Sequence, residues 1–181
     1  MELKNMVALV SRTGRHMQRY NFLGHRQVVG CIPYRYKGNR GTPSVVDEEE
    51  IEVLVITSQR KGKGMLFPKG GWEIDESIED AALRETVEEA GVVGDVERKL
   101  GKWNFKSKSS DTSYEGHMFP LLVKEQLEFW PEKDVRQRLW ISVREARKVC
   151  QYWWMKEALE LLVNRLAAQA NEAKTDMKSN L

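Results

Sequence analysis

The chain has 181 residues, enough for one domain with a sizeable core, and its 41% hydrophobic and 31% charged residues are typical of a soluble globular protein. No apolar run approaches the roughly 20 residues that cross a bilayer, which excludes a transmembrane helix. Cys31 and Cys150 stand in apolar contexts without further local ligands, so we expect buried reduced thiols and not a zinc site.

Almost all charged residues of the N-terminal region are basic. Between residues 1 and 46 the only acidic residue is Glu2, whereas the basic residues are Lys4, Arg12, Arg15, Arg19, Arg26, Arg35, Lys37 and Arg40. Such a composition is typical of a mitochondrial transit peptide, but the same side chains in a folded protein would hold phosphate. We expect residues 1–26 to form a retained basic arm packed on the domain. We expect a cytoplasmic or nuclear protein, with a mitochondrial location as the alternative.

Three strands are predicted before the central motif. Residues 27–36 (QVVGCIPYRY) and 51–58 (IEVLVITS) are rich in β-branched and aromatic residues, and the second run is apolar enough for a central strand. A polar loop over residues 37–50 joins them. A basic, glycine-rich turn over residues 60–64 then leads to a short apolar strand at residues 65–68.

The central motif lies in residues 70–92 (GGWEIDESIEDAALRETVEEAGV), which carry the spacing G-x5-E-x7-R-E-x-x-E-E-x-G. Its positions are filled by Gly70, Glu76, Arg84, Glu85, Glu88, Glu89 and Gly91. From typical residue frequencies, the chance of such a match in this chain is on the order of one in a million. Ser77 is a good N-cap residue, and Gly91 stands at the C-terminal end of the helical pattern, where a glycine in the left-handed conformation often ends a helix. A helix of about four turns is therefore predicted between them.

The carboxylates of this helix indicate a metal site. Glu85, Glu88 and Glu89 are related by i, i+3 and i+4, so they share one face, and without a cation they repel each other. Arg84 can reach Glu88 at i+4, and the remaining oxygen ligands suit Mg²⁺ or Mn²⁺. The alternative is a solvated acidic face, which the complete spacing disfavours.

The last third of the chain predicts further strands and two helices. Strands are expected at residues 99–108, 114–123 and 138–143. Ser142 and Glu145 form a capping box that opens a helix through Val149, and residues 153–168 have the apolar stripe of an amphipathic helix. We expect one domain over residues 27–170, with a mixed sheet packed between helices, and a disordered polar tail over residues 171–181.

The motif resembles the Nudix box, so the chain is identified as a member of the Nudix hydrolases. The resemblance implies an α/β/α sandwich and a Mg²⁺-dependent hydrolase, with Mn²⁺ as a substitute, that cleaves a diphosphate linked to another group. It also implies that Glu85, Glu89 and Glu88 hold the metal together with Gly70. Glu88 would alternatively be the base that deprotonates water, and Arg84 would orient the glutamates. Thr86 departs from the family, which usually has an aliphatic residue there.

Within that family, the chain looks like the diphosphoinositol polyphosphate phosphohydrolase branch, especially its plant members. The stretches that carry this resemblance are SRTGRHMQRY, RQVVGCIPYR, KGGWE, LGKWNFKSK and FWPEKDVRQRLWISVREARKVCQYWWMKEAL. The substrate contacts it implies are Arg19, Arg26, Ser58, Arg60, Arg136 and Lys148. Lys69 is a further candidate. Animal members of the branch usually have a glycine there, and a lysine also occurs in diadenosine tetraphosphate hydrolases.

These observations leave three hypotheses about function, of which two are enzymatic and one is not. The first is removal of the β-phosphate from diphosphoinositol polyphosphates, and the second is cleavage of diadenosine polyphosphates or other nucleoside-diphosphate-linked compounds. A nucleotide base would need an aromatic platform, for which Trp72, Trp103 and Tyr114 are candidates. A silent phosphate- or RNA-binding module is disfavoured because no carboxylate of the box is missing. We expect a monomer that binds a polyphosphorylated small molecule, with no membrane and no specific nucleic acid as partner.

Overall fold

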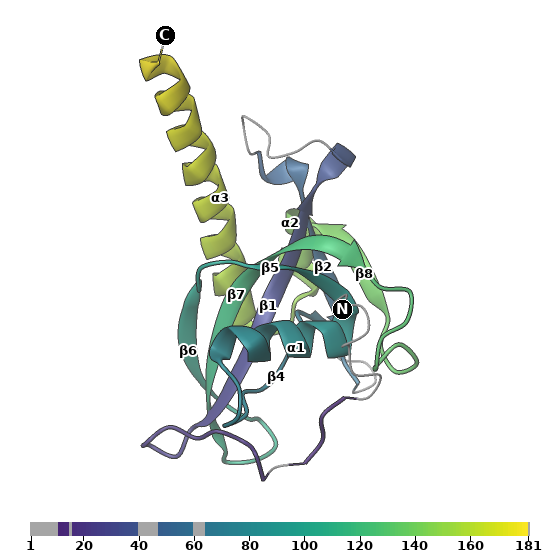
Figure 1. The fold of residues 1–181 in the computed structure, drawn as a ribbon. Helices are drawn as coiled ribbons and strands as arrows, with labels where there is room; N and C mark the ends of the chain where they lie inside the picture. Colours follow the sequence, from purple (N-terminus) through teal and green to yellow (C-terminus); the bar gives the residue numbers. More distant parts are fainter. Residues whose placement is uncertain (1–10, 15, 40–46, 60–63, 181) are drawn as a thin grey trace.

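The computed structural model of the protein describes residues 11–14, 16–39, 47–59 and 64–180 (Figure 1). The expected turn over residues 60–64, including Arg60, therefore lies almost entirely outside the described residues.

One mixed sheet forms the middle of the molecule. Its eight strands are β1 (Arg26–Tyr36), β2 (Ile51–Thr57), β3 (Met65–Leu66), β4 (Lys69–Gly71), β5 (Val92–Val96), β6 (Gly101–Lys106), β7 (Ser113–Gln126) and β8 (Arg138–Ser142). Strand β1 is central: it runs parallel to β7 and antiparallel to β2 and β4. Strands β5 and β6 pair with β7, and β3 and β8 pair with β2, all antiparallel. Two 3-10 turns, η2 (Lys37–Asn39) and η3 (Glu48–Glu50), lie between β1 and β2.

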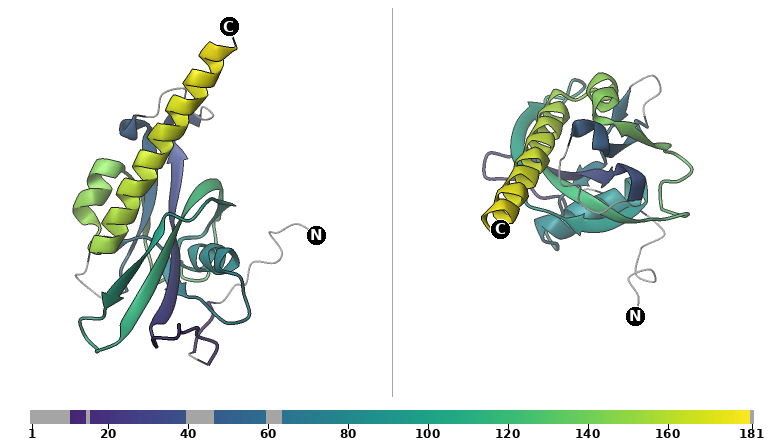
Figure 2. Two further views of the ribbon diagram at one scale, coloured as in Figure 1. Left: turned by 90° about the vertical axis from the view of Figure 1, so that its left-hand side faces the viewer. Right: turned by 90° about the horizontal axis from the view of Figure 1, so that it is seen from above.

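Helices cover both faces of the sheet. Helix α1 (Ile78–Ala90) lies on one face, and α2 (Val143–Val149) and α3 (Trp153–Ser179) lie on the other (Figure 2). Small residues of α1 and large residues of α3 belong to one hydrophobic core with β1, β2 and β7; among them are Ala81, Ala82, Trp154, Leu159 and Leu162. The expected α/β/α sandwich with a mixed sheet is confirmed.

The C-terminal segment differs from its prediction. Residues 171–181 were expected to be a disordered tail, but α3 continues to Ser179. The physical reason lies in the local sequence: the helix contains no glycine or proline, and Ala, Glu, Lys and Met, which favour helices, follow Ala170. Ala170 itself is buried, which extends the packed part of α3 beyond the predicted end at residue 168.

Short strands were also missed, whereas other local predictions hold. The strands β4 and β5 were not predicted, because they are short and their pairing with β1 and β7 depends on distant residues. Cys31 and Cys150 are buried free thiols, as expected. None of the described helices combines the length and apolar character that a bilayer crossing needs.

Candidate active site

Helix α1 presents the glutamates of the motif. The Ser77 hydroxyl oxygen accepts a hydrogen bond from the Asp80 backbone N–H at 3.1 Å, and Gly91 adopts a left-handed conformation (φ 63°) that closes the other end. Both predicted caps are confirmed. Glu85, Glu88 and Glu89 are only 8%, 5% and 7% exposed. The shared acidic face is therefore turned into the protein, and a solvated helix face is excluded.

Gly70 allows Glu85 to lie against the sheet. Gly70 is in β4, where it pairs with Val29 of β1. A Cβ placed on Gly70 would stand 2.0 Å from Glu85 Oε2, a distance that no side chain tolerates. The glycine at the start of the motif is thus required by the close approach of a carboxylate to backbone.

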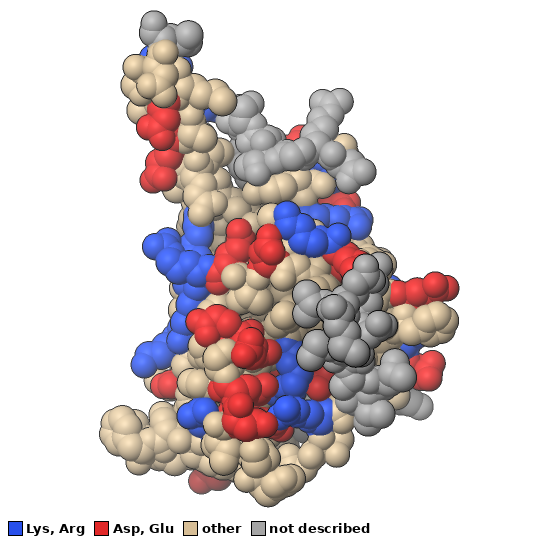
Figure 3. Space-filling model, viewed as in Figure 1, with Lys and Arg blue, Asp and Glu red and all other residues tan. Residues whose placement is uncertain are grey.

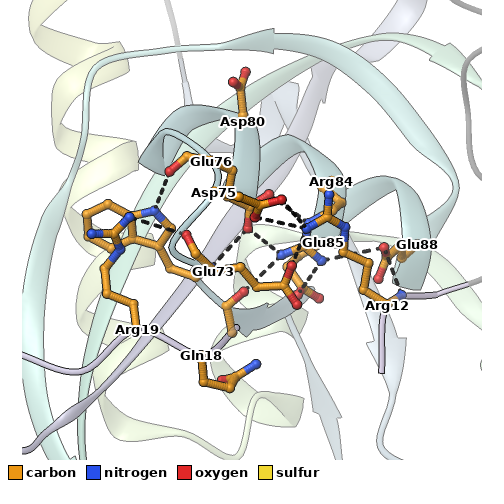
Figure 4. Close-up of polar contacts among 12 residues, drawn as sticks. Arg12, Gln18, Arg19, Glu73, Asp75, Glu76, Asp80, Arg84, Glu85 and Glu88 are labelled. Atoms are coloured by element: carbon orange, nitrogen blue, oxygen red, sulfur yellow. Dashed lines mark hydrogen bonds and ion pairs between the residues drawn. The ribbon is translucent and has the colours of Figure 1, made fainter. Parts of the chain in front are cut away.

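Arg84 joins the acidic residues of the motif to one another (Figure 4). Its guanidinium donates to Glu76 Oε2 at 2.9 Å and Oε1 at 2.6 Å, to Glu85 Oε1 at 2.8 Å and to Glu88 Oε1 at 3.5 Å. It also donates to the Gly71 carbonyl oxygen at 2.9 Å. With all these contacts Arg84 fixes the orientation of Glu85 and Glu88, which is the geometry that the orienting role requires.

The third glutamate is held by residues outside the helix. Glu89 Oε2 accepts a hydrogen bond from the Lys69 backbone N–H at 2.9 Å, and Glu89 Oε1 accepts one from Arg136 Nη2 at 3.1 Å. Arg136 also donates to the Thr57 carbonyl oxygen and to Glu132 Oε1. The backbone N–H of Glu132 donates to the Glu88 carbonyl oxygen at 3.1 Å, so the segment before β8 is tied to α1.

Burial leaves the charge of this cluster incompletely balanced. Desolvation raises the pKa of Glu85 to about 8 and that of Glu89 to about 7, and it also raises the pKa of Glu88. Neighbouring carboxylates add to the rise, whereas Arg84, Lys69 and Arg136 oppose it. A further cation among the glutamates would be stabilised.

The donor set fits a hard divalent cation, because it consists of buried carboxylates on one helix face. Within the described part of the chain, however, no three His, Cys, Asp or Glu side chains already converge on one point where they could hold an ion. Their oxygens point instead to arginine and backbone donors. A metal bound by Glu85, Glu88 and Glu89 would therefore compete with these donors for the carboxylate oxygens.

The N-terminal arm contributes contacts that the sequence did not predict. The Arg12 guanidinium pairs with Glu73 and with Asp75 Oδ1 at 3.1 Å, and its backbone N–H donates to Glu88 Oε1 at 3.3 Å. Glu73 and Glu132 were also not predicted as residues of the site. Of these three residues, only Arg12 was marked by the sequence, as one of the basic residues of an acid-poor segment.

Two arginines expected at the substrate make other contacts. Arg19 lies on the Trp72 ring, with Cζ 4.1 Å from the ring centroid, and donates to the carbonyl oxygens of Glu73 and Ile74. This face of Trp72 is therefore covered. Arg26 donates to Gln18 Oε1 at 2.5 Å and lies 5.9 Å from the centroid of the Tyr114 ring.

The remaining candidates are scattered. The Ser58 backbone N–H donates to the Gly64 carbonyl oxygen at 3.4 Å, just after β2. Lys148 is exposed on α2, on the face of the sheet opposite α1. Arg60 lies outside the described residues. The structure thus brings Lys69 and Arg136 to the glutamates, but it does not bring Lys148 there.

On the face seen in Figure 3, acidic and basic side chains are intermingled over α1, and basic ones continue along the β6 side.

Comparisons with known proteins agree with this geometry. A family model described as NUDIX domain matches residues 35–162. The chain is 60% identical to Nudix hydrolase 17, mitochondrial, of Arabidopsis thaliana over 177 residues, which cover 97% of this chain and 94% of the relative. It is 38% identical to diphosphoinositol polyphosphate phosphohydrolase 3-alpha of Mus musculus over 134 residues, 73% of each chain.

Among solved structures, a C. elegans Ap4A hydrolase binary complex matches with a TM-score of 0.59 at 20% identity, covering 78% of this chain and 98% of that one. This likeness shows the fold. Together with the matched domain and the capped, buried glutamate helix, it leads to one conclusion: the chain belongs to the Nudix family.

Proposed function

We propose that the protein is a Mg²⁺-dependent Nudix hydrolase, with Mn²⁺ as a substitute ion, that removes the β-phosphate from diphosphoinositol polyphosphates. The observation that carries the hydrolase assignment is the buried cluster of Glu85, Glu88 and Glu89, oriented by Arg84 and raised in pKa. A divalent cation would stabilise such a cluster, and it would also offset the negative charge of a phosphoanhydride substrate.

In this proposal Glu85, Glu89 and Glu88, with Gly70, hold the metal. The bound ion would polarise the phosphoryl oxygens and lower the pKa of water. Glu88 accepts the proton of the attacking water, whose oxygen bonds to the β-phosphorus while the bond to the bridging oxygen breaks and the inositol phosphate leaves. Arg84 keeps Glu85 and Glu88 in place through the contacts described above.

The substrate assignment rests on the resemblance and on basic residues. Arg19, Arg26, Ser58, Arg60, Lys69, Arg136 and Lys148 are the proposed contacts to the inositol phosphates. Of these residues, Lys69 and Arg136 lie beside the proposed metal site, since the Lys69 backbone N–H and the Arg136 guanidinium both donate to Glu89. The relative from mouse, whose name states a diphosphoinositol polyphosphate phosphohydrolase, supports the same substrate class.

Hydrolysis of diadenosine polyphosphates is the second candidate, supported by Lys69 and by the name of the C. elegans protein of similar fold. The aromatic residues favour the first candidate. Trp72 carries Arg19 on one face, Tyr114 stacks on Phe105 at 5.3 Å, and the Trp103 ring N–H donates to Glu157 of α3. Two of the three expected platforms, Trp72 and Tyr114, thus already have a partner on a ring face.

A side-by-side turnover assay with Mg²⁺ tests the proposal. Diphosphoinositol pentakisphosphate should be hydrolysed faster than diadenosine tetraphosphate, and Glu88→Gln should lose turnover of both substrates. Faster cleavage of the dinucleotide would replace the first substrate by the second. Undiminished hydrolysis by Glu88→Gln would remove the proposed base.

Location and assembly complete the proposal. The organelle in the name of the Arabidopsis relative favours the mitochondrial alternative over the cytoplasmic one. Because Arg12 contacts Glu73, Asp75 and Glu88, processing on import should leave Arg12 in the mature chain. Import of a fluorescent fusion, followed by N-terminal sequencing, tests both points.

The protein is proposed to act as a monomer on a small molecule, which sedimentation analysis tests.

A further inference from the structure

Arg136 occupies an unusual position for a residue expected to bind phosphate. Its side chain is only 10% exposed, and all three guanidinium nitrogens donate to protein acceptors. These acceptors are Glu89 Oε1 at 3.1 Å, the Thr57 carbonyl oxygen at 2.9 Å and Glu132 Oε1 at 3.3 Å. Arg136 thus bridges α1, the end of β2 and the segment before β8.

Both oxygens of Glu89 are already used in this arrangement. The Lys69 backbone N–H occupies Oε2, and Arg136 occupies Oε1. The Lys69 donor is part of β4 and cannot move away without breaking strand pairing with β1. A divalent cation that binds Glu89 therefore competes with the side chain of Arg136.

Arg84 is less able to give way. It is anchored by two hydrogen bonds to Glu76 and one to the Gly71 carbonyl oxygen, all within the motif. Arg136 is held at the far side by Glu132, which also accepts a hydrogen bond from Gln59 Nε2 at 2.8 Å. Of the two arginines whose guanidinium groups contact the glutamates, Arg136 is the one whose other contacts, Thr57 and Glu132, lie outside the motif.

We propose that Arg136 is a positioning residue that exchanges partners: it holds Glu89 while no metal is bound, and when a divalent cation takes Glu89 it turns to a substrate phosphate. The proposal rests on the proposed function in assigning Glu89 to the metal and in taking a substrate that carries phosphate. Planar guanidinium groups bind carboxylate and phosphate with the same paired geometry, so the exchange needs no new chemistry. It makes metal binding and phosphate binding reinforce each other through one side chain.

The test measures metal binding without turnover, by calorimetry with Mn²⁺ alone. Arg136→Gln removes the competitor, so its dissociation constant for Mn²⁺ should fall about tenfold, within the usual range of coupling between sites. Arg138→Gln is the matched control. This substitution also removes one positive charge close to α1. Unlike Arg136, however, Arg138 donates to backbone carbonyl oxygens, those of Ala90, Gly91 and Leu127. Its Mn²⁺ affinity should stay within about twofold of the unchanged protein.

A second measurement follows phosphate. The unchanged protein should bind inorganic phosphate more tightly when Mg²⁺ is present, and Arg136→Gln should lose about fivefold of that gain. Arg136→Lys keeps the charge without the planar fork, so it should give an intermediate result and serves if the glutamine variant does not fold.

The outcomes separate this inference from the proposed function. Unchanged Mn²⁺ affinity in Arg136→Gln, or equal tightening in Arg138→Gln, would overturn the exchange. A protein that hydrolyses no diphosphoinositol polyphosphate, yet binds Mn²⁺ more tightly without Arg136, would overturn the substrate assignment and keep the exchange.

Discussion

The guanidinium of Arg19 lies over the indole ring of Trp72, with Cζ 4.1 Å from the ring centroid, while the Trp72 ring N–H donates to the Glu76 carbonyl oxygen at 3.0 Å. Through Glu76, which receives two hydrogen bonds from Arg84, this pair connects the N-terminal arm to the glutamates of α1. Trp72 therefore supports the loop before helix α1.

Trp72→Phe should slow catalysis by loosening this loop. The change removes one hydrogen bond and weakens a cation–π contact, for a loss of about 1–2 kcal/mol of folding free energy. We expect kcat to fall more than KM rises, because Trp72 holds Glu76 and Glu76 in turn holds Arg84 in the orientation that positions the glutamates. The control is Trp140→Phe. Trp140 carries Arg35 at 4.0 Å and donates to Gln126, a similar pair of contacts on β8. Equal loss of turnover in both variants would contradict the prediction.

Gly70→Ala should displace Glu85. The new methyl group would stand 2.0 Å from Glu85 Oε2, so the carboxylate must move by more than an ångström, which at a catalytic site costs on the order of 100-fold in turnover. Gly101→Ala serves as the control, because its new methyl group would meet only ring carbons of Trp103, the nearest at 3.1 Å. Steady-state kinetics compares the two, and a fully active Gly70→Ala enzyme would exclude Glu85 from the site.

Glu76→Gln should destabilise the fold far more than the loss of a surface ion pair. Glu76 and Arg84 pair at 2.6 Å with side chains only 8% and 15% exposed, and breaking such a pair costs about 3–5 kcal/mol. Glu49→Gln breaks a pair with Arg144 that is 68% and 72% exposed, so its cost should stay below about 1 kcal/mol. Urea unfolding measures both. Similar midpoints for the two variants would show that Arg84 does not depend on Glu76.

Stability without metal should fall as pH rises through the neutral range. Burial raises the pKa of Glu85 to about 8 from its ordinary 4.5, so the folded chain binds a proton that the unfolded chain has lost between these values. Rising pH therefore favours unfolding, by up to about 1.4 kcal/mol per pH unit for one group. Urea unfolding in EDTA from pH 5 to 8.5 measures this slope.

Two variants check the assignment of that slope. Glu85→Gln should flatten it, whereas Mg²⁺ should restore stability to the unchanged protein at high pH. Glu48→Gln is the control: the hydrogen bond from Arg147 lowers the pKa of Glu48 from 4.5, so the stabilisation that Glu48 gives is lost only below the measured range, and this variant should keep the slope from pH 5 to 8.5. A slope that Glu85→Gln leaves intact would assign the effect to other groups.

Local sequence rules explain how much of the site was predictable. The caps at Ser77 and Gly91 need only neighbouring residues, and so does the shared face of the glutamates. Arg84 reaches Glu88 at i+4, as the spacing predicts. The contact of Arg136 with Glu89 joins residues 47 positions apart, and that of Arg12 with Glu73 joins residues 61 positions apart. No periodicity or spacing encodes such pairs.

By itself, then, the sequence determined a capped helix with carboxylates at i, i+3 and i+4, the strands with strong β-branched character, and the family. Only the tertiary structure decided that these carboxylates are buried, that Trp72 is covered by Arg19, and that Arg136 faces Glu89. The physical reason is that helix caps and side-chain faces follow from the geometry of a few adjacent residues. Burial and pairing instead depend on which distant segments the sheet brings together, so they arise only when the chain has folded.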